Sequence, residues 1–367
     1  MLATKSAASA SRLIVVALAA LCATTVPVQA SRQVIDAISL PAVDPDAAFA
    51  QCGSQYYIAD QHARIIYKID RKTGDASVIS PKQIRGDPQD VSSSNRNQCW
   101  FSFAKPDVLA TLQSGDTFKP YYISSESNWL DNITVASNGT VWFSLGRHSQ
   151  IGYRSATGAL RTYNLPMSAK SGTADWIRQP FASARLIAPT PLPTSDTYSF
   201  PLPVVEAITT DLAGNSYFLV AALSGTPFIA KVKENAESFS AMSLPNELAF
   251  GFFAMSDGTV VVATEPNVLL ISPDGATTSI PLPHTQEHCR NRTSIQTASI
   301  NPSRTVAYFT APLEGKLYSL RQEHGHFRIR KVFSGTDCPA SVVVQDDGKL
   351  AVFDPTSRML TIIPQPQ

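Results

Sequence analysis

Short apolar stretches alternate with tight turns along most of the chain, and this pattern predicts a fold built from β-strands. The clearest copy begins at the turn Asn138-Gly139 and continues as the strand Thr140–Ser144. Further strands follow at Ile151–Arg154 and Leu160–Leu165, with turns between them. No stretch has a convincing helical period, so we expect an all-β chain with little helix.

This strand–turn unit recurs seven times, with one hydrophobic anchor position in each copy. Neighbouring anchors are 42 to 47 residues apart, apart from one gap of 75 residues. Repeats of this length are typical of the four-stranded blades of β-propellers, so we expect a seven-bladed β-propeller. The anchors are Tyr57, Phe101, Phe143, Phe218, Val262, Phe309 and Val352.

The seventh copy lacks a fourth strand, because the chain stops shortly after Leu360–Ile363. A strand of the missing type, Val34–Pro41, stands near the other end of the chain. We therefore expect this N-terminal strand to complete the last blade and close the ring. Closure would remove an open sheet edge, which is otherwise a site for unwanted pairing.

The gap of 75 residues contains one blade and an insertion over residues 167–203. The insertion includes Trp176 and Phe181 and then a proline-rich stretch. It connects the last strand of one blade with the first strand of the next, on the face that we expect to hold the site. A loop of this length is usually either functional or disordered. Two interpretations stay open: a lid with Trp176 and Phe181 over the channel mouth, or a segment without fixed structure.

Composition and charge narrow the possible partners. The chain of 367 residues is 44% hydrophobic and 16% charged, which is enough apolar material for a substantial core. The formal net charge of +1 provides no field that would attract nucleic acid, so nucleic acid is not an expected partner.

Residues 1–30 have the pattern of a signal peptide. Two basic residues precede the apolar run Leu13–Ala23, and Val28–Ala30 fits the small-residue cleavage rule. The apolar run is short for a membrane span, although an uncleaved anchor is the alternative. We therefore expect residues 31–367 to form a single propeller domain, secreted or periplasmic, with no membrane contact after cleavage.

Four cysteines remain after such a cleavage, and an even number in an oxidising compartment predicts two disulfides. The repeat alignment places Cys52 and Cys99 in neighbouring blades on one face. It places Cys289 and Cys338 before the first strands of two adjacent blades, on the opposite face. The alignment therefore favours the pairs Cys52–Cys99 and Cys289–Cys338.

The string HTQEH is the densest group of chemically active side chains and contains His284, Glu287 and His288. The letters match the H-x-x-E-H motif of some peptidases, but that motif requires a helix, and strands flank this string. In a loop before the sixth blade's first strand, the two histidines could bind a metal or take a proton, with Glu287 as a third catalytic candidate. Arg290 could contact a ligand. The alternative is a solvated polar loop pinned by Cys289.

Loops between second and third strands lie on the same expected face. Gln61-His62 and Arg147-His148 occupy equivalent loops of this kind, so Arg147 and His148 are candidate ligand contacts. Trp176, in the insertion, is a further candidate. The alternative for each is a side chain that simply faces solvent.

Several carboxylates precede first strands and could therefore gather at the channel mouth. Paired carboxylates there could hold Mg²⁺ or Ca²⁺ through oxygen ligands, and Asp337 could join His284 and His288 in a metal site. They could equally cap turns by accepting backbone N–H groups. These carboxylates are Asp87, Asp90, Asp131, Glu206, Glu247 and Asp337.

The repeat unit, Asn/Asp-Gly and Val-Trp-Phe-Ser, then Ile-Gly, a turn and a strand ending in Leu-Pro, resembles the virginiamycin B lyase family of propellers. It is more loosely similar to NHL-like and gluconolactonase-like propellers. The resemblance implies an elimination that opens an ester-linked ring, with a divalent metal, usually Mg²⁺, and a histidine base before a first strand. The sequence departs from this pattern. Leu145 stands at the repeat-glutamate position of the best copy, Asp354 occupies that position in the last blade, and Ala340 stands where the base is expected.

These departures favour a binding propeller that presents its loops to a small molecule, a glycan or another exported protein. The alternative is a metal-dependent lyase or lactone hydrolase that uses His284, Glu287 and His288 near the channel carboxylates. The fold alone does not choose between them. Convergent carboxylates with a histidine would indicate the enzyme, whereas a wide mixed face with aromatics such as Trp129 would indicate the binding protein.

Overall fold

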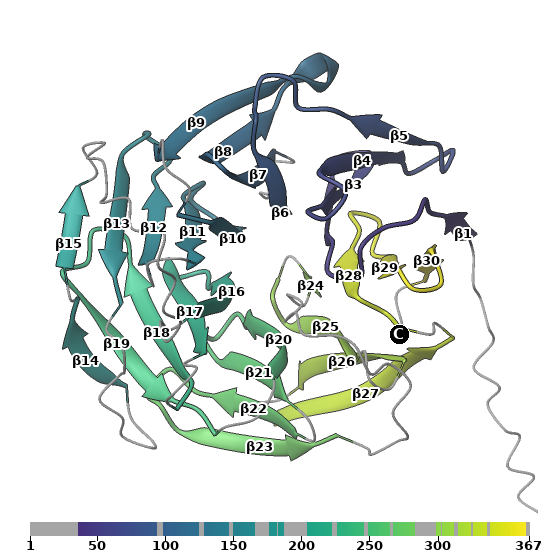
Figure 1. Ribbon diagram of the computed structural model, residues 1–367. Coiled ribbons are helices and arrows are strands. Elements are labelled where there is room, and N and C mark those ends of the chain that lie inside the picture. Colours follow the sequence, from purple (N-terminus) through teal and green to yellow (C-terminus); the bar gives the residue numbers. More distant parts are fainter. Residues whose placement is uncertain are drawn as a thin grey trace, which may run out of the picture. The chain divides into compact units, whose positions relative to one another are not determined.

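The chain divides into two compact units, residues 1–33 and 34–367, and the first lies outside the described residues. The described strands of the second unit form seven antiparallel sheets, the blades of a β-propeller (Figure 1). In the described part of the chain, helix is limited to one 3₁₀ turn, Ser114–Asp116, and no helix is long and apolar enough to span a membrane. The all-β, seven-bladed prediction is confirmed. The computed structural model describes residues 36–93, 98–124, 128–146, 150–165, 176–181, 183–186, 204–221, 226–245, 249–264, 267–282, 299–301, 303–311, 315–323, 326–335 and 338–364.

Each blade is an antiparallel meander whose first strand lies innermost and whose last strand lies at the rim (Figure 1). The first strands are β2 (Ala48–Cys52), β6 (Asp87–Ser93), β10 (Leu130–Val135), β16 (Val204–Thr210), β20 (Ala249–Ala254), β24 (Ser299–Ile300) and β28 (Ser341–Val344). The second strands are β3 (Gln55–Asp60), β7 (Cys99–Ala104), β11 (Val141–Leu145), β17 (Asn215–Ala221), β21 (Val260–Thr264), β25 (Val306–Ala311) and β29 (Leu350–Asp354). The third strands are β4 (Ile65–Asp70), β8 (Asp107–Leu112), β12 (Gln150–Arg154), β18 (Phe228–Lys233), β22 (Asn267–Ile271), β26 (Lys316–Glu323) and β30 (Met359–Ile363). The fourth strands are β5 (Ala76–Ile79), β9 (Phe118–Ser124), β13 (Leu160–Asn164), β19 (Ser238–Ser243), β23 (Thr277–Pro281), β27 (His326–Ser334) and, in blade 7, β1 (Asp36–Ser39).

The core consists of apolar side chains packed between neighbouring blades. All seven sequence anchors are buried, as the repeat pattern predicts. Trp142 of blade 3 illustrates the packing: its ring lies 4.8 Å from the ring of Tyr153 and 5.7 Å from that of Phe218 in blade 4. Second strands are covered on both faces, which is why they are continuously apolar rather than alternating. The turn before β11 closes at Gly139, whose φ of 87° favours a residue without a Cβ.

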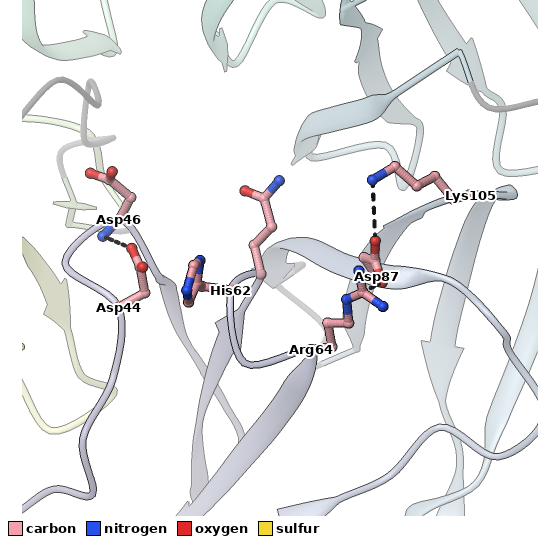
Figure 2. A pocket seen from close by; sticks show the side chains of 7 residues that line it. Asp44, Asp46, His62, Arg64, Asp87 and Lys105 are labelled. Carbon is pink, nitrogen blue, oxygen red and sulfur yellow. Dashed lines mark hydrogen bonds and ion pairs between the residues drawn. The ribbon is translucent and has the colours of Figure 1, made fainter.

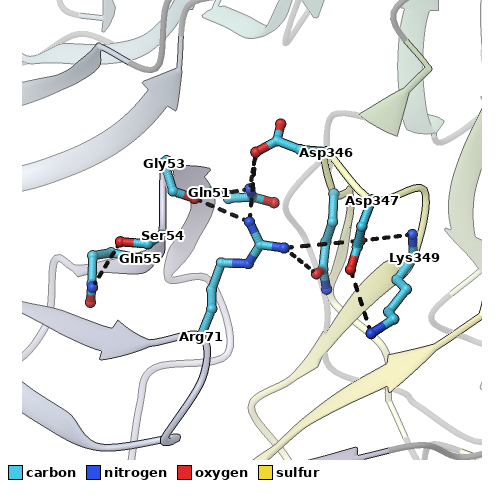
Figure 3. Close-up of polar contacts among 9 residues, drawn as sticks. Gln51, Gly53, Ser54, Gln55, Arg71, Asp346, Asp347 and Lys349 are labelled. Carbon is cyan, nitrogen blue, oxygen red and sulfur yellow. Dashed lines mark hydrogen bonds and ion pairs between the residues drawn. The ribbon is translucent and has the colours of Figure 1, made fainter.

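The ring closes as predicted, because β1 pairs antiparallel with β30 and completes blade 7. Arg71, in the β4–β5 turn, bridges blades 1 and 7 on the face of the ring that carries the turns between first and second strands (Figure 3). Its guanidinium donates to the carbonyl of Gly53 at 3.2 Å and to the side-chain oxygen of Gln345 at 2.7 Å. It also lies 3.7 Å from the Asp346 carboxylate. The junction between the two ends of the propeller is therefore held by a strand pair and a charged network.

The described part of the insertion lies at the outer rim. Residues Ile177–Pro180 form β14, a fifth strand on blade 4, and Ser183–Leu186 form β15, a fifth strand on blade 3. Phe181 between them is buried, with its ring 4.2 Å from Tyr163 and 5.2 Å from Phe239. Residues 176–186 therefore link blades 3 and 4 at their outer edges, and we call this segment the outer clip.

This arrangement corrects the interpretation that Trp176 and Phe181 lie over the channel mouth. Trp176 packs beside Tyr217, with ring centroids 6.0 Å apart, and its indole N–H donates to the Ser272 carbonyl of blade 5 at 3.5 Å. Both aromatic side chains pack against apolar residues at the rim, and this burial stabilises them there. Residues 187–203 lie outside the described residues, and a lid formed by them stays a prediction.

The predicted disulfide between Cys52 and Cys99 is present, with a Cα–Cα distance of 5.7 Å, and it joins blades 1 and 2. On the chain-entropy model, closing a loop of this size stabilises the fold by about 4 kcal/mol. Cys338 is also disulfide-bonded. Cys289 lies outside the described residues, so its pairing with Cys338 stays a prediction.

Replacing Phe181 with alanine should lower the free energy of unfolding by about 3–5 kcal/mol, because the variant leaves a cavity between two blades. Urea denaturation measures this change. Leu212→Ala is the control, since Leu212 is 47% exposed, and it should shift stability by no more than about 0.5 kcal/mol. Equal effects of the two substitutions would contradict the role of the clip.

Candidate functional site

A cavity of about 450 Å³ opens on the face that carries the loops between second and third strands (Figure 2). Its walls come from blades 1 and 2 and are predominantly polar. Gln61 and His62 lie there in the loop between β3 and β4, as the repeat alignment predicts. The lining residues are Asp44, Asp46, Gln61, His62, Arg64, Asp87 and Lys105.

The buried carboxylate of Asp60 fixes two of the cavity's loops. Asp60 ends β3 and is 1% exposed. One of its oxygens accepts the N–H of Asp44 at 3.0 Å, and the other accepts the N–H of Ala63 at 2.8 Å. The first bond holds the connection that leads into β2, and the second holds the β3–β4 loop. Asp44 and His62 are therefore presented to the cavity by backbone that one carboxylate positions.

Charges of both signs meet on the side of the cavity that Arg64, Asp87 and Lys105 form. The Asp87 carboxylate lies 3.2 Å from the Arg64 guanidinium and 3.5 Å from the Lys105 ammonium (Figure 2). Arg64 is largely exposed, so this pair contributes little to stability. On the side that the β1–β2 connection forms, Asp44 accepts the N–H of Asp46 at 2.8 Å. The cavity thus offers hydrogen-bond donors on one side and acceptors on the other.

Left-handed backbone occurs at two residues that line this cavity and at Trp129 beside them, among seven such non-glycine residues in the described part of the chain. Arg64, Lys105 and Trp129 have φ values of 59°, 61° and 63°. Arg358, in the equivalent loop of blade 7, repeats the conformation of Arg64 at 55°. Such a conformation costs a residue with a side chain about 1 kcal/mol or more and is found most often at functional sites. Lys105 also places its ammonium 5.3 Å from the centre of the Trp129 ring, which lines up an aromatic face beside the cavity.

Two predicted channel carboxylates lie on adjacent inner strands. Asp90 sits at a bulge of β6 and Asp131 at a bulge of β10, and both are half-buried. Desolvation raises the pKa of Asp90 to about 7; the N–H groups of Ile133 and Val91 oppose this, and the charge of Asp131 adds to it. Desolvation likewise raises the pKa of Asp131 to about 6. Both carboxyls therefore hold a proton to higher pH than an ordinary aspartate does.

These two carboxylates do not by themselves form a metal site. Within the described ranges no three His, Cys, Asp or Glu side chains are grouped so that they could hold a metal ion. The carboxylate in the repeat-glutamate position, Asp354, is fully buried and accepts the N–H groups of Cys338, Thr356 and Ser357. It caps a turn, which is the alternative that the sequence left open.

Most of the site residues proposed from sequence cannot be placed. Of the remainder, Trp176 lies at the rim, and Asp87 lines the cavity. Arg64 and Lys105 were missed, although Arg64 belongs to the same loop as Gln61 and His62, which the repeat alignment did identify. Those outside the described residues, whose roles stay predictions, are Arg147, His148, His284, Glu287, His288, Arg290 and Asp337.

Asp131→Asn should raise the free energy of unfolding at pH 7.5 by on the order of 1 kcal/mol. An aspartate whose pKa is raised by folding binds its proton more tightly in the folded state, so its contribution to stability falls as pH rises from about 4 toward 7. At pH 5 the folded carboxyl is largely protonated while the unfolded one is already ionised, so the advantage of the variant should shrink to about half of its value at pH 7.5. Urea denaturation at both pH values tests this.

The control for this experiment is Asp75→Asn, which alters an exposed carboxylate in a turn of blade 1. It should show no such dependence on pH. If Asp131→Asn changed stability equally at pH 5 and pH 7.5, the raised pKa would be wrong.

No protein-family model matches the chain, and no curated protein sequence matches it. Solved structures do match in fold. A streptogramin B lyase superposes with a TM-score of 0.63 at 13% identity, over 90% of this chain and 97% of the lyase. Virginiamycin B lyase from Staphylococcus aureus gives 0.62 at 13% identity, over 89% and 98%. The extracellular domain of a one-component system from B. thetaiotaomicron gives 0.52 at 12%, over 90% of this chain and 42% of that one. The chain is a seven-bladed β-propeller that resembles virginiamycin B lyase in fold.

Proposed function

We propose that the protein is an exported propeller that binds a small polar ligand in the cavity between blades 1 and 2. The observation that carries the proposal is the cavity itself: charged side chains from three connections and from the first residue of β6 converge on it, and two of them, Arg64 and Lys105, have left-handed backbone. Strain of this kind persists where surrounding structure holds it in place, and it is concentrated at ligand sites. A loop without such a role could carry glycine at these positions, because glycine adopts left-handed backbone at no steric cost.

The chemistry of the walls favours a sugar or a sugar acid. Asp44, Asp46 and Asp87 supply hydrogen-bond acceptors, and Arg64 and Lys105 supply donors. Hydroxyl groups can donate to the first set and accept from the second. Trp129 does not line the cavity, but its ring lies under the Lys105 ammonium and favours the position of this donor. A short glycan is therefore the ligand class that we favour among small molecules, glycans and exported proteins.

Two observations argue against the activity that the fold resemblance suggests. Ala340 is fully buried, and it stands where the family's histidine base is expected. Leu145 is buried at the repeat-glutamate position of blade 3, and Asp354 in blade 7 is fully used in bonding to backbone. Neither position supplies a free acid or base, so the lyase residue set is incomplete.

Export is supported by the pattern of residues 1–30 and by the disulfide between Cys52 and Cys99, which is typical of oxidising compartments. A fold neighbour is the extracellular domain of a signalling protein. We infer a secreted or periplasmic location.

A thermal-shift screen of monosaccharides, sugar acids and short oligosaccharides tests the binding function. A compound that stabilises the wild type should bind at least tenfold more weakly to Arg64→Gly, because the variant loses a cavity donor. The free energy of unfolding of the same variant should stay constant or rise by up to about 1 kcal/mol, since glycine relieves the left-handed strain.

Lys349→Ala, on the opposite face beside Asp347, is the matched control and should bind as the wild type does. If Arg64→Gly and the control bound every active compound equally well, the cavity would not be the site.

A metal-dependent lyase or lactone hydrolase is the second candidate. The observation that favours it is the pair of channel carboxylates, because a raised pKa suits proton transfer near neutral pH. Elemental analysis decides between the two functions. On the binding proposal, purified protein should contain no stoichiometric divalent metal and should melt at the same temperature with and without chelator. Bound Mg²⁺, Ca²⁺ or Zn²⁺ whose removal lowers the melting temperature would support the enzyme, with His284→Ala and His288→Ala as the next variants.

A further inference from the structure

The outermost strand of blade 6 carries an unusual row of cationic side chains. β27 is nine residues long, and His326, Arg328, Arg330 and Lys331 are all exposed along it. Its apolar residues Phe327 and Ile329 pack inward against the cluster shared with blade 5. β27 lies at the outer edge of blade 6 (Figure 1), and Val332 and Phe333 near its end pack against the cluster shared with blade 7. Arg328 and Arg330 remain exposed and can meet something outside the molecule.

His326, Arg328 and Arg330 share one face with an arginine of the neighbouring strand, whereas Lys331 stands opposite Tyr318 on the other side. In the pairing of β26 with β27, Arg321 stands directly opposite Arg328, and Ser319 stands opposite Arg330. Residues two apart on a strand are about 7 Å apart on the same face, so three guanidinium groups gather within a small area. Like charges placed directly opposite one another destabilise a sheet. Folding alone gives no reason for this arrangement.

Only part of this charge is neutralised. Glu323 lies 3.9 Å from Arg321 and 3.6 Å from Arg328. No ion pair involves Arg330 or Lys331 among the residues that the structure describes. One carboxylate therefore lies among three guanidinium groups, and this basic strip of Arg321, Arg328 and Arg330 keeps a positive surplus on a protein whose formal net charge is only +1.

Protection of a sheet edge is the competing explanation, since charged residues on edge strands block pairing with other chains. The other outermost strands use that device much less. β5 and β23 contain no charged residue, and β1, β9, β14 and β15 contain one each. Edge protection would act on these strands as well, so the concentration on β27 has a more specific cause.

We propose that the exposed face of β27, with Arg321 beside it, binds a linear acidic polysaccharide. Guanidinium groups form paired hydrogen bonds with carboxylates and sulfates, which favours arginine where such groups are recognised. The basic residues of β27 span His326 to Lys331, about 17 Å of extended strand, so they fit several units of an extended polymer better than a compact anion. The proposal concerns a different blade from the cavity and does not depend on the ligand bound there.

The test uses the chain of residues 31–367 and three probes: heparin, polygalacturonate, and vesicles of mixed neutral and anionic phospholipid. Wild-type protein should bind heparin or polygalacturonate, and which of them it prefers identifies sulfate or carboxylate as the group recognised. Arg328→Ser with Arg330→Ser should weaken that binding at least tenfold and make it less sensitive to salt, because fewer polymer charges are contacted.

Lys72→Ser with Lys82→Ser is the matched control, since it removes the same charge from exposed positions in blade 1. The control should bind as the wild type does, and melting curves should confirm that both variants fold. Equal losses of polysaccharide binding in the two variants would show that binding depends only on net charge, which would overturn the proposal. Absence of polysaccharide binding, or binding to the vesicles alone, would overturn it as well.

Discussion

Buried carboxylates that bind backbone N–H groups are the constraint on which the working face of this propeller depends. Asp60, Asp107 and Asp354 are almost completely buried. Each accepts N–H groups from a connection that leads into a first strand, from Asp44, from Asn128 and Leu130, and from Cys338 respectively. An ionised carboxylate without such partners would be too costly to bury, and so would the unpaired N–H groups. The loops are therefore fixed by the same bonds that make the carboxylates tolerable inside the fold.

The hydrogen bonds of a buried aspartate show whether its carboxylate is used to hold the backbone or is open to a ligand. Asp60 and Asp354 spend both oxygens on backbone N–H groups, so they have little capacity left for a ligand. By the same measure Asp90 is a structural acid too, because its two oxygens accept the N–H groups of Val91 and Ile133. Among the acids with a raised pKa, Asp131 is one for which no such bond is found in the described part of the chain. A sequence motif with an acid at a repeated position therefore does not by itself identify chemistry. What decides is whether the surrounding backbone has already taken the oxygens.

The repeat pattern predicted the blades because each blade carries its own period and its own buried anchor, such as Phe143 or Phe309. It also predicted ring closure, since a missing strand at one end and a spare strand at the other can be recognised without tertiary information. The outer clip was not predictable in this way. β14 and β15 pair with strands of two different blades, and only the assembled rim offers those edges. The left-handed backbone of Arg64 and Lys105 was hidden for a related reason, because a sequence signals such positions through glycine, and here glycine is absent.

The cavity and the basic strip differ in what holds their residues in place. Cavity residues stand on loops that a buried carboxylate fixes, so their geometry is tied to the stability of the fold. The exposed side chains of β27 have no such tie, since the strand is held by its pairing with β26 and by its apolar residues, such as Phe327 and Ile329, rather than by its arginines. Neutral residues at Arg328 and Arg330 would fold at least as well, because they would remove the repulsion with Arg321. A feature that costs stability and is not required by packing is best explained by a contact outside the molecule. The small net charge conceals this, because acids elsewhere on the ring balance a strip that remains locally positive.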